Sequence, residues 1–216
     1  MKSKSAGAYL VAIIFGLILV TVGTWNGYLK HYLMANAEST RAEQLFNSPT
    51  GQLEYLLIPE VNLNGNTTLT PGQDFAVIRI PSLGTDWIRT ISEGTTPQIL
   101  DRLGTGHYIG TEFPGEPGNF AIAGHSGNKW TPFARYQEID IGDLIEIETF
   151  SFKFTYQVAE TVIVDETNMA TVYENPSLKD STADESWLTI TTCLIEGQKE
   201  KRIAIFAKLV SEDSKE

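Results

Sequence analysis

The sequence predicts an all-β domain, a barrel or a sandwich, that follows one apolar N-terminal helix. Short apolar or alternating runs recur at close spacing from Phe75 to Val210, with only brief helical segments between them. Such spacing is typical of all-β barrels and sandwiches. An uncharged, mostly apolar run from Ala6 to Trp25 stands apart from the rest of the chain. About 20 apolar residues are enough for a helix to span the hydrocarbon core of a membrane.

The apolar run is interpreted as an uncleaved membrane anchor. Lys2 and Lys4 precede it, and the positive-inside rule then places the N-terminus in the cytoplasm and the rest of the chain outside. The alternative is a signal peptide cleaved near residues 35–37. The run is longer than the core of about 7–15 residues in signal peptides, and Lys30 separates it from that site. A single-pass anchor is therefore favoured, and on either interpretation the chain leaves the cytoplasm.

Each further element is predicted from its local pattern. Residues 26–73 are interpreted as a stalk, with a short helix over Ala35–Phe46. A second short helix is expected over Thr96–Leu103, because Pro97 suits the first helical position. The strands are expected where apolar residues run together or alternate. They cover, in chain order, Phe75–Ile80, Trp87–Ile91, Phe120–Ala123, Leu144–Glu148, Phe152–Val158 (extended or followed by Val162–Val164), Trp187–Cys193 and Arg202–Val210.

Length and charge limit the partners of this chain. Its 216 residues carry 16 basic and 27 acidic side chains. Without the two lysines before the anchor, the external part has 14 basic residues and a net charge of −13. This charge argues against nucleic acid and against an anionic membrane surface as partners. The expected organisation is an anchor (1–25), a stalk (26–73), one β domain (74–211) and a polar tail (212–216), and the β domain is long enough for a real core.

Cys193 is the only cysteine in the chain, and it ends the strand that begins at Trp187. A lone thiol cannot form an intramolecular disulfide, although exported proteins mostly use their cysteines in pairs. It therefore indicates intermolecular pairing or a reactive group, and we interpret it as a nucleophile. The alternative is a small, inert, apolar side chain, which is how most free cysteines behave.

Two other strand ends carry side chains that suit a cysteine nucleophile. Arg202 begins the next strand nine residues after Cys193, and His125 closes an upstream apolar strand. A neighbouring imidazole or guanidinium favours the thiolate. Acyl transfer also needs donors for the developing negative oxygen and a group that moves protons. Antiparallel pairing would bring Cys193 and Arg202 to one end of the barrel. His107, in a segment expected to be a loop, competes with His125 for the proton-transfer role.

Two stretches of the chain resemble the sortase family. The first is Gly106-His107-Tyr108 followed by the run from Pro114 to His125, and the second is Leu188-Thr189-Ile190-Thr191-Thr192-Cys193 with Arg202 nine positions on. The second is similar to the TLxTC signature of the family and its following arginine, with Ile190 at the variable position. Ile78-Arg79-Ile80-Pro81 also resembles the first barrel strand of sortases. The resemblance covers roughly residues 75–210.

This resemblance implies an eight-stranded β-barrel held at the outer face of a Gram-positive membrane. Cys193 would be the nucleophile, His125 the acid and base, and Arg202 the group that orients substrate and stabilises the oxyanion. A sortase cleaves an LPxTG- or LAxTG-type motif of a surface protein between Thr and Gly through a thioacyl intermediate. It passes the acyl group to an amine of a lipid II-like peptidoglycan precursor or of a pilin lysine. No cofactor is implied.

The sequence of the segment that ends at His125 is most similar to those of class E sortases, which are housekeeping enzymes similar to class D. The chain departs from actinobacterial relatives after Cys193, where it has Leu194-Ile195-Glu196-Gly197. A pilin-polymerising sortase usually adds a C-terminal membrane helix and an aspartate-aromatic lid. Here residues 211–216 are polar, and Asp86-Trp87 leads directly into a strand. Pilin polymerisation remains the alternative.

The segment from Val164 to Glu185 is expected to cover the peptide groove. Ala123, Val172, Thr191 and Thr192 are predicted to line that groove. No metal is predicted, because three dispersed histidines and one cysteine offer no ligand-spaced pair. A calcium site within residues 165–185 stays open, although nothing in the sequence specifies one.

Three other functions account for the sequence less well. An L,D-transpeptidase places its arginine much closer to its cysteine than Arg202 lies to Cys193. A serine hydrolase would need G-x-S-x-G spacing, which the segment from Gly124 to Gly127 lacks. A membrane-tethered β adhesion or binding module with an inert, buried Cys193 remains, and it predicts a thiol that reacts slowly with small electrophiles.

Overall fold

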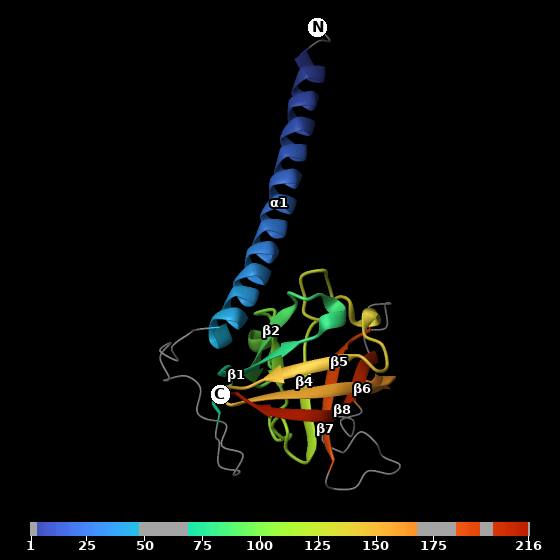
Figure 1. Ribbon diagram of the computed structural model, residues 1–216. Helices are drawn as coiled ribbons and strands as arrows, with labels where there is room; N and C mark the ends of the chain where they lie inside the picture. Colours follow the sequence, from blue (N-terminus) through green and yellow to red (C-terminus); the bar gives the residue numbers. More distant parts are fainter. Residues whose placement is uncertain (1–3, 48–68, 168–184, 195–200, 216) are drawn as a thin grey trace.

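The computed structural model describes residues 4–47, 69–167, 185–194 and 201–215. Within these residues, eight strands close into one barrel in the order β1-β2-β3-β4-β7-β8-β6-β5, below a long helix (Figure 1). The predicted fold class, an eight-stranded β-barrel with short helices after an apolar N-terminal helix, is confirmed. The strands are β1 (Asp74–Arg79), β2 (Ile88–Glu93), β3 (Thr105–His107), β4 (Gly118–Ala123), β5 (Leu144–Glu148), β6 (Phe152–Asp165), β7 (Ser186–Cys193) and β8 (Lys201–Ser214).

The helical elements are α1 (Lys4–Asn47), α2 (Pro97–Leu100), and two 3-10 turns, η1 (Pro81–Leu83) and η2 (Tyr136–Glu138). α2 begins at Pro97, as predicted, with Thr96 as its N-cap, but it ends earlier than expected. α1 joins the apolar run and the helix expected over Ala35–Phe46 into one helix. No proline interrupts the intervening residues, so nothing in that segment stops the helix.

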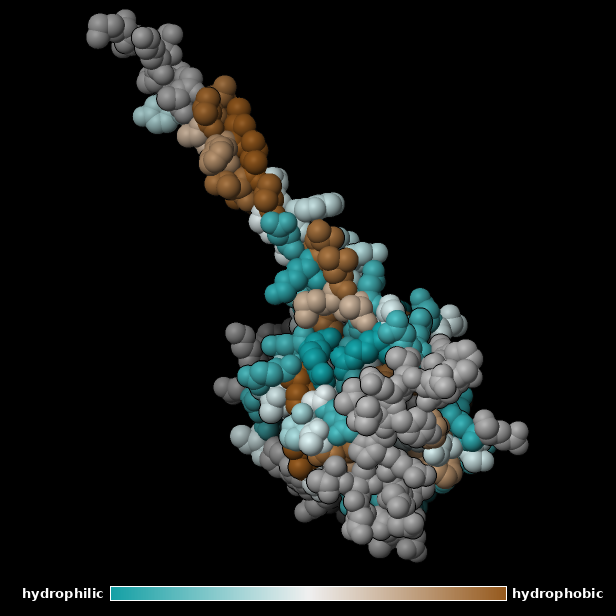
Figure 2. All heavy atoms as spheres, turned by 90° about the vertical axis from the view of Figure 1, so that its left-hand side faces the viewer, coloured by the Kyte–Doolittle hydropathy of each residue, from teal (hydrophilic) through white to brown (hydrophobic). Residues whose placement is uncertain are grey.

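α1 contains a span of the kind that crosses membranes. From Tyr9 to Leu45, the helix includes an 18-residue window with a mean hydropathy of 2.0, and none of that window is buried. By length and composition, it fits a membrane anchor or a signal segment. Figure 2 shows an apolar surface along the upper part of the helix that gives way to polar residues toward the barrel.

The lower end of α1 packs on the outer face of β1 and β2. Ala42 lies in a buried cluster with Val77 and Ile88. Glu38, only 3% exposed, accepts hydrogen bonds from the backbone N–H of Thr90 (2.9 Å) and from its hydroxyl group. This part of the predicted stalk therefore lies on the barrel, and its contact explains why β1 and β2 are buried on both faces.

The interior of the barrel is filled by large side chains from every side. The fully buried ones include Phe75, Ile78, Ile91, Phe120, Ile122, Ile145, Ile147, Phe154, Tyr156 and Ile190. Burial of each such side chain stabilises the fold by about 1.5–3 kcal/mol. β5 and the first half of β6 alternate between buried and exposed residues, as their period-two pattern predicts.

Two parallel pairings set the topology that positions the site. β2 pairs with β3 in parallel, and β4 pairs with β7 in parallel. β3 replaces the loop expected around His107. At Gly106, a Cβ would lie 2.3 Å from the carbonyl oxygen of Gly94, so only glycine allows β3 to approach this closely. The expected strand Val162–Val164 is the end of the long β6, which pairs with β8 along its length.

Candidate active site

Cys193 and Arg202 lie directly opposite each other at one end of the barrel. β7 and β8 are antiparallel, and their register pairs Cys193 with Arg202, as the sequence predicted. Side chains at opposed positions share one face of a sheet, with Cβ atoms about 4.5–5.5 Å apart. The register therefore holds a guanidinium beside the thiol.

His125 follows β4, the strand on the other side of β7. The backbone N–H of Gly124 donates to the carbonyl of Thr191 (3.2 Å), and the hydroxyl of Thr192 donates to the carbonyl of Gly124 (2.7 Å). The hydroxyl of Ser126 donates to the carbonyl of Cys193 (2.6 Å). The residues on both sides of His125 are thus bonded to the strand that ends at the thiol.

Gly124 is needed by packing. A Cβ at this position would lie 2.6 Å from the Phe133 ring, which is fully buried in the core. The backbone N–H of Phe133 also donates to the carbonyl of His125 (2.9 Å). The close approach of this ring and the hydrogen bond together fix the backbone at His125.

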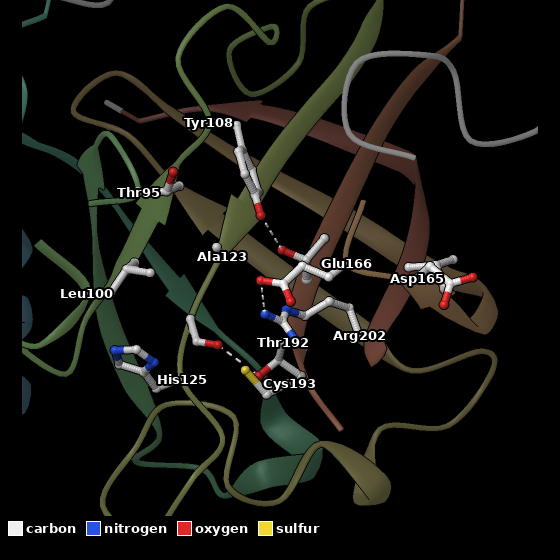
Figure 3. A pocket seen from close by; sticks show the side chains of 13 residues that line it. Thr95, Leu100, Tyr108, Ala123, His125, Asp165, Glu166, Thr192, Cys193 and Arg202 are labelled. Carbon is white, nitrogen blue, oxygen red and sulfur yellow. Dashed lines mark hydrogen bonds and ion pairs between the residues drawn. The ribbon is translucent and has the colours of Figure 1, made fainter. Parts of the chain in front are cut away.

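One pocket, with a volume of about 340 Å³, contains the predicted residues. Cys193, His125 and Arg202 line it together, and in Figure 3 the sulfur lies between the imidazole and the guanidinium. Ala123, Thr191 and Thr192 belong to the same lining, whereas Val172 lies outside the described residues. A pocket of this size is within the range of ligand-binding sites. Its remaining lining residues are Thr95, Leu100, Tyr108, Gly124, Val164, Asp165 and Glu166.

The imidazole of His125 has a carboxylate partner that the sequence did not suggest. Its Nε2 lies 3.0 Å from Oδ1 of Asp101, the C-cap residue that follows α2. An ionised carboxylate only accepts hydrogen bonds, so Nε2 carries a proton. In the neutral ring, Nδ1 is then the nitrogen that can take up a proton. Both side chains are open to solvent, at 37% and 70% exposure.

Arg202 also has an acidic partner. Its Nη2 lies 2.7 Å from Oε1 of Glu166, in the turn after β6, and its Nη1 donates to the carbonyl of Lys201 (3.1 Å). The register of β6 and β8 places Val164 opposite Arg202, which carries Glu166 to the pocket. The strand expected over Val162–Val164 indicated that β6 runs on toward Glu166. Its register with β8, which brings Glu166 close to Arg202, could not be read from the sequence.

His107, the competing histidine, belongs to the core. It is 1% exposed, and its Nδ1 lies 2.7 Å from Oε2 of Glu93. Its Nε2 lies 2.9 Å from the hydroxyl of Thr111, and its ring contacts those of Phe75 and Phe120. His107 therefore does not line the pocket, whereas its neighbour Tyr108 does and bonds through its hydroxyl to Thr191 (2.9 Å).

The expected calcium-binding segment, residues 165–185, lies mostly outside the described residues. Among the residues that the structure does describe, no cluster of histidine, cysteine, aspartate and glutamate is arranged to hold a metal ion. Asp86 and Trp87 lie before β2, and Trp87 packs against the barrel core, with its ring 6.2 Å from that of Phe133. It is a structural residue in this position.

Comparison with known proteins relates this chain to sortases. A family model described as a sortase domain matches residues 78–210. The chain is 32% identical over 149 residues to sortase SrtE1 of Streptomyces coelicolor, and 29% identical over 143 residues to sortase D of Bacillus subtilis. These matches cover 66% and 65% of this chain, but only 42% and 66% of the two relatives.

A solved structure shares the fold. It is sortase E1 from Streptomyces coelicolor with a tripeptide in the active site, which is 29% identical to this chain with a TM-score of 0.60. The similarity covers 68% of this chain and 94% of that one. The residues that the sortase-domain family model matches, 78–210, include Cys193, His125 and Arg202.

Proposed function

Because this chain belongs to the sortase family, we propose that it is a membrane-anchored cysteine transpeptidase that cleaves an LPxTG- or LAxTG-type sorting motif between Thr and Gly. The cleaved surface protein is transferred to an amine of a lipid II-like cell-wall precursor. The catalytic domain lies outside the membrane, with α1 as a single-pass anchor and the N-terminus in the cytoplasm.

One observation carries this proposal: Cys193 and Arg202 are paired across β7 and β8, and His125 lines the same pocket. The thiol is half-buried rather than sealed in the core. This placement favours an enzyme over an adhesion module with an inert cysteine, because a peptide carbonyl that enters the pocket can reach the sulfur.

The first half of the reaction forms a thioacyl intermediate. The imidazole of His125 first takes up the proton of the Cys193 thiol, which gives a thiolate and an imidazolium. The thiolate attacks the carbonyl carbon of the motif threonine, a C–S bond forms, and the carbonyl π bond opens to an oxyanion. Arg202 donates N–H groups to the oxyanion that develops, a role that suits its planar and permanently charged group. His125 then protonates the glycine nitrogen, so that the C–N bond breaks and the C-terminal peptide leaves as an amine.

The second half reverses the proton movement. The acceptor amine attacks the thioacyl carbon, and His125 accepts a proton from it. A new amide bond forms while the C–S bond breaks, which regenerates the thiolate. The hydrogen bond to Asp101 orients the imidazole for both steps, because it fixes which ring nitrogen carries the proton.

The walls of the pocket suit an extended peptide with an apolar residue. Leu100, Ala123 and Val164 offer apolar contacts, and the hydroxyl groups of Thr191 and Thr192 lie on the β7 side. The Tyr108–Thr191 hydrogen bond fixes one edge of this wall. The tripeptide in the active site of the sortase E1 structure supports the same use of the pocket.

The test is a transpeptidation assay with residues 37–216, a fragment that retains the contact of Glu38 with β2. The fragment is incubated with paired LPxTG and LAxTG peptides and with triglycine, and the products are identified by mass. We expect a ligated product, and a thioacyl adduct on Cys193 when the amine is omitted. Absence of cleavage with either peptide, while the thiol still reacts with methanethiosulfonate, would refute the proposed function. A lysine peptide as second acceptor detects pilin-type polymerisation.

A further inference from the structure

Three aromatic side chains form a stripe on α1 where its apolar run ends. Trp25, Tyr28 and Tyr32 are three and four residues apart and therefore lie on one face of the helix. The rings of Trp25 and Tyr28 stack, with centroids 6.3 Å apart. The three residues are 65%, 47% and 41% exposed. Tryptophan and tyrosine gather at membrane–water interfaces, at the level of the lipid headgroups.

A turn of the barrel reaches this stripe. The Trp130 ring meets those of Tyr28 and Tyr32 edge to face, with centroids 5.4 and 5.6 Å apart. The ammonium group of Lys129 lies 4.7 Å from the centroid of the Tyr28 ring and 4.6 Å from that of Trp130. In Figure 1, the connection between β4 and β5 is the edge of the barrel nearest to the upper part of α1.

The depth of this contact follows from helix geometry. A helix rises 1.5 Å per residue, so Tyr28 and Tyr32 lie about 4.5 and about 10 Å beyond Trp25, the last residue of the apolar run. Each interfacial layer of a bilayer is roughly 5–8 Å thick. Trp130 contacts both tyrosines and therefore lies between these two depths, at the outer edge of the headgroup layer, when α1 spans the membrane along its normal.

We infer that the Lys129–Trp130 turn is a second membrane contact, seated among the phospholipid headgroups beside the anchor. This inference rests on the anchor in the proposed function. The Lys129 ammonium suits a lipid phosphate, and the Trp130 ring suits the boundary between headgroups and acyl chains. The external part of the chain has a net charge of −13, so the overall charge does not draw the barrel to an anionic surface. Instead, the α1 anchor and the side chains of Lys129 and Trp130 hold the barrel at the membrane surface.

Hydrogen bonds within the turn, and between its neighbours and β7, couple the position of the turn to that of the pocket. The backbone N–H of Trp130 donates to Oδ1 of Asn128 (2.9 Å), and the hydroxyl of Thr131 donates to the carbonyl of Asn128 (2.6 Å). The turn begins three residues after His125, whose neighbour Ser126 is bonded to the carbonyl of Cys193. The membrane contact therefore sets the height of the pocket above the lipid surface, where a lipid-linked amine would be presented.

The experiment measures quenching of tryptophan fluorescence by lipids brominated near the headgroup end of their acyl chains. Full-length protein is reconstituted into phosphatidylcholine–phosphatidylglycerol vesicles. Three variants each keep one tryptophan, Trp25, Trp130 or Trp187, and replace the others with phenylalanine. Trp187 is the matched control, because it lies on β7 and is 7% exposed. We expect Trp25 and Trp130 to be quenched several-fold more than Trp187.

The outcomes separate the inference from the proposed anchor. If Trp25 is quenched and Trp130 is quenched no more than Trp187, the anchor stands and the second contact is refuted. If Trp25 is not quenched, both the anchor and the inference fail. Because Trp87→Phe and Trp187→Phe can perturb the barrel, Trp130→Phe alone is also compared with the unaltered protein. The quenchable part of the emission should fall in this variant, and an unchanged quenchable part would overturn the inference.

Discussion

The junction between α1 and the barrel offers a stability test whose size can be worked out from the structure. Glu38 is almost fully buried, and it accepts hydrogen bonds from both the backbone N–H and the hydroxyl of Thr90. β3 pairs with β2 only from Ile91 onward, so it provides no strand partner for the N–H of Thr90. The carboxylate of Glu38 takes the place of the missing strand acceptor.

Glu38→Ala should therefore cost more than the loss of one surface contact. It leaves a buried N–H without its acceptor, which costs about 1–3 kcal/mol. It also removes the carboxylate next to Arg89, whose pKa is lowered by burial and partly restored by Glu38. An uncompensated charge at Arg89 adds to the loss. We expect the free energy of unfolding to fall by about 2–4 kcal/mol in total.

Urea unfolding of residues 37–216, followed by circular dichroism at neutral pH, measures this change. Glu43→Ala is the matched control, because Glu43 lies on the same helix and is exposed. Its free energy of unfolding should stay within about 0.5 kcal/mol of the unaltered fragment. If Glu38→Ala were as mild as Glu43→Ala, the helix would not be part of the barrel fold, and the reasoning from the buried carboxylate would be wrong.

Four further predictions concern the pocket and the barrel. Cys193→Ala should abolish cleavage of a sorting-motif peptide and leave the circular dichroism spectrum unchanged; near-normal turnover would contradict the nucleophile assignment. Arg202→Lys keeps the charge but loses the planar pair of N–H donors, so kcat should fall roughly tenfold or more, and an unchanged kcat would mean that charge alone suffices. His125→Ala should lower the rate by orders of magnitude without lowering the urea midpoint, whereas His107→Ala should lower the midpoint, because it breaks a buried network; equal midpoints would place His107 outside the core. Burial alone would raise the pKa of Glu148, but the hydrogen bond and charge of Lys215, with the charge of Arg79, outweigh it and hold the pKa below its usual value. This stabilisation is present above the usual carboxyl pKa and is lost as the pH falls through the lowered one. Glu148→Gln should therefore destabilise the protein at neutral pH and lose its effect in acid, as urea titrations at both pH values would show; an effect that persists in acid would contradict this ionic origin.

Local sequence patterns predicted the structure best where strands that pair with each other are also consecutive in the sequence. Cys193 and Arg202 end and begin consecutive strands, so antiparallel pairing followed from their spacing alone. The alternation in β5 and β6 likewise marked their buried faces. The choice between His125 and His107 was different, because residue type and the preceding glycine are the same at both positions. The resemblance to sortases favoured His125, and the structure buries His107 against Glu93, outside the pocket.

The sequence by itself determined the all-β class, the apolar helix and the residue types at the end of β7, because periodicity and residue type act over short distances along the chain. The closed barrel was expected only from the resemblance to sortases. Only the tertiary structure decided which distant groups meet. The parallel pairing of β4 with β7 brings His125 to Cys193 across 68 positions of sequence. The continuous helix α1 packs on β2 and buries Glu38. The register of β6 with β8 places Glu166 next to Arg202. These contacts join segments whose local patterns carry no information about each other, and the closed barrel makes them neighbours.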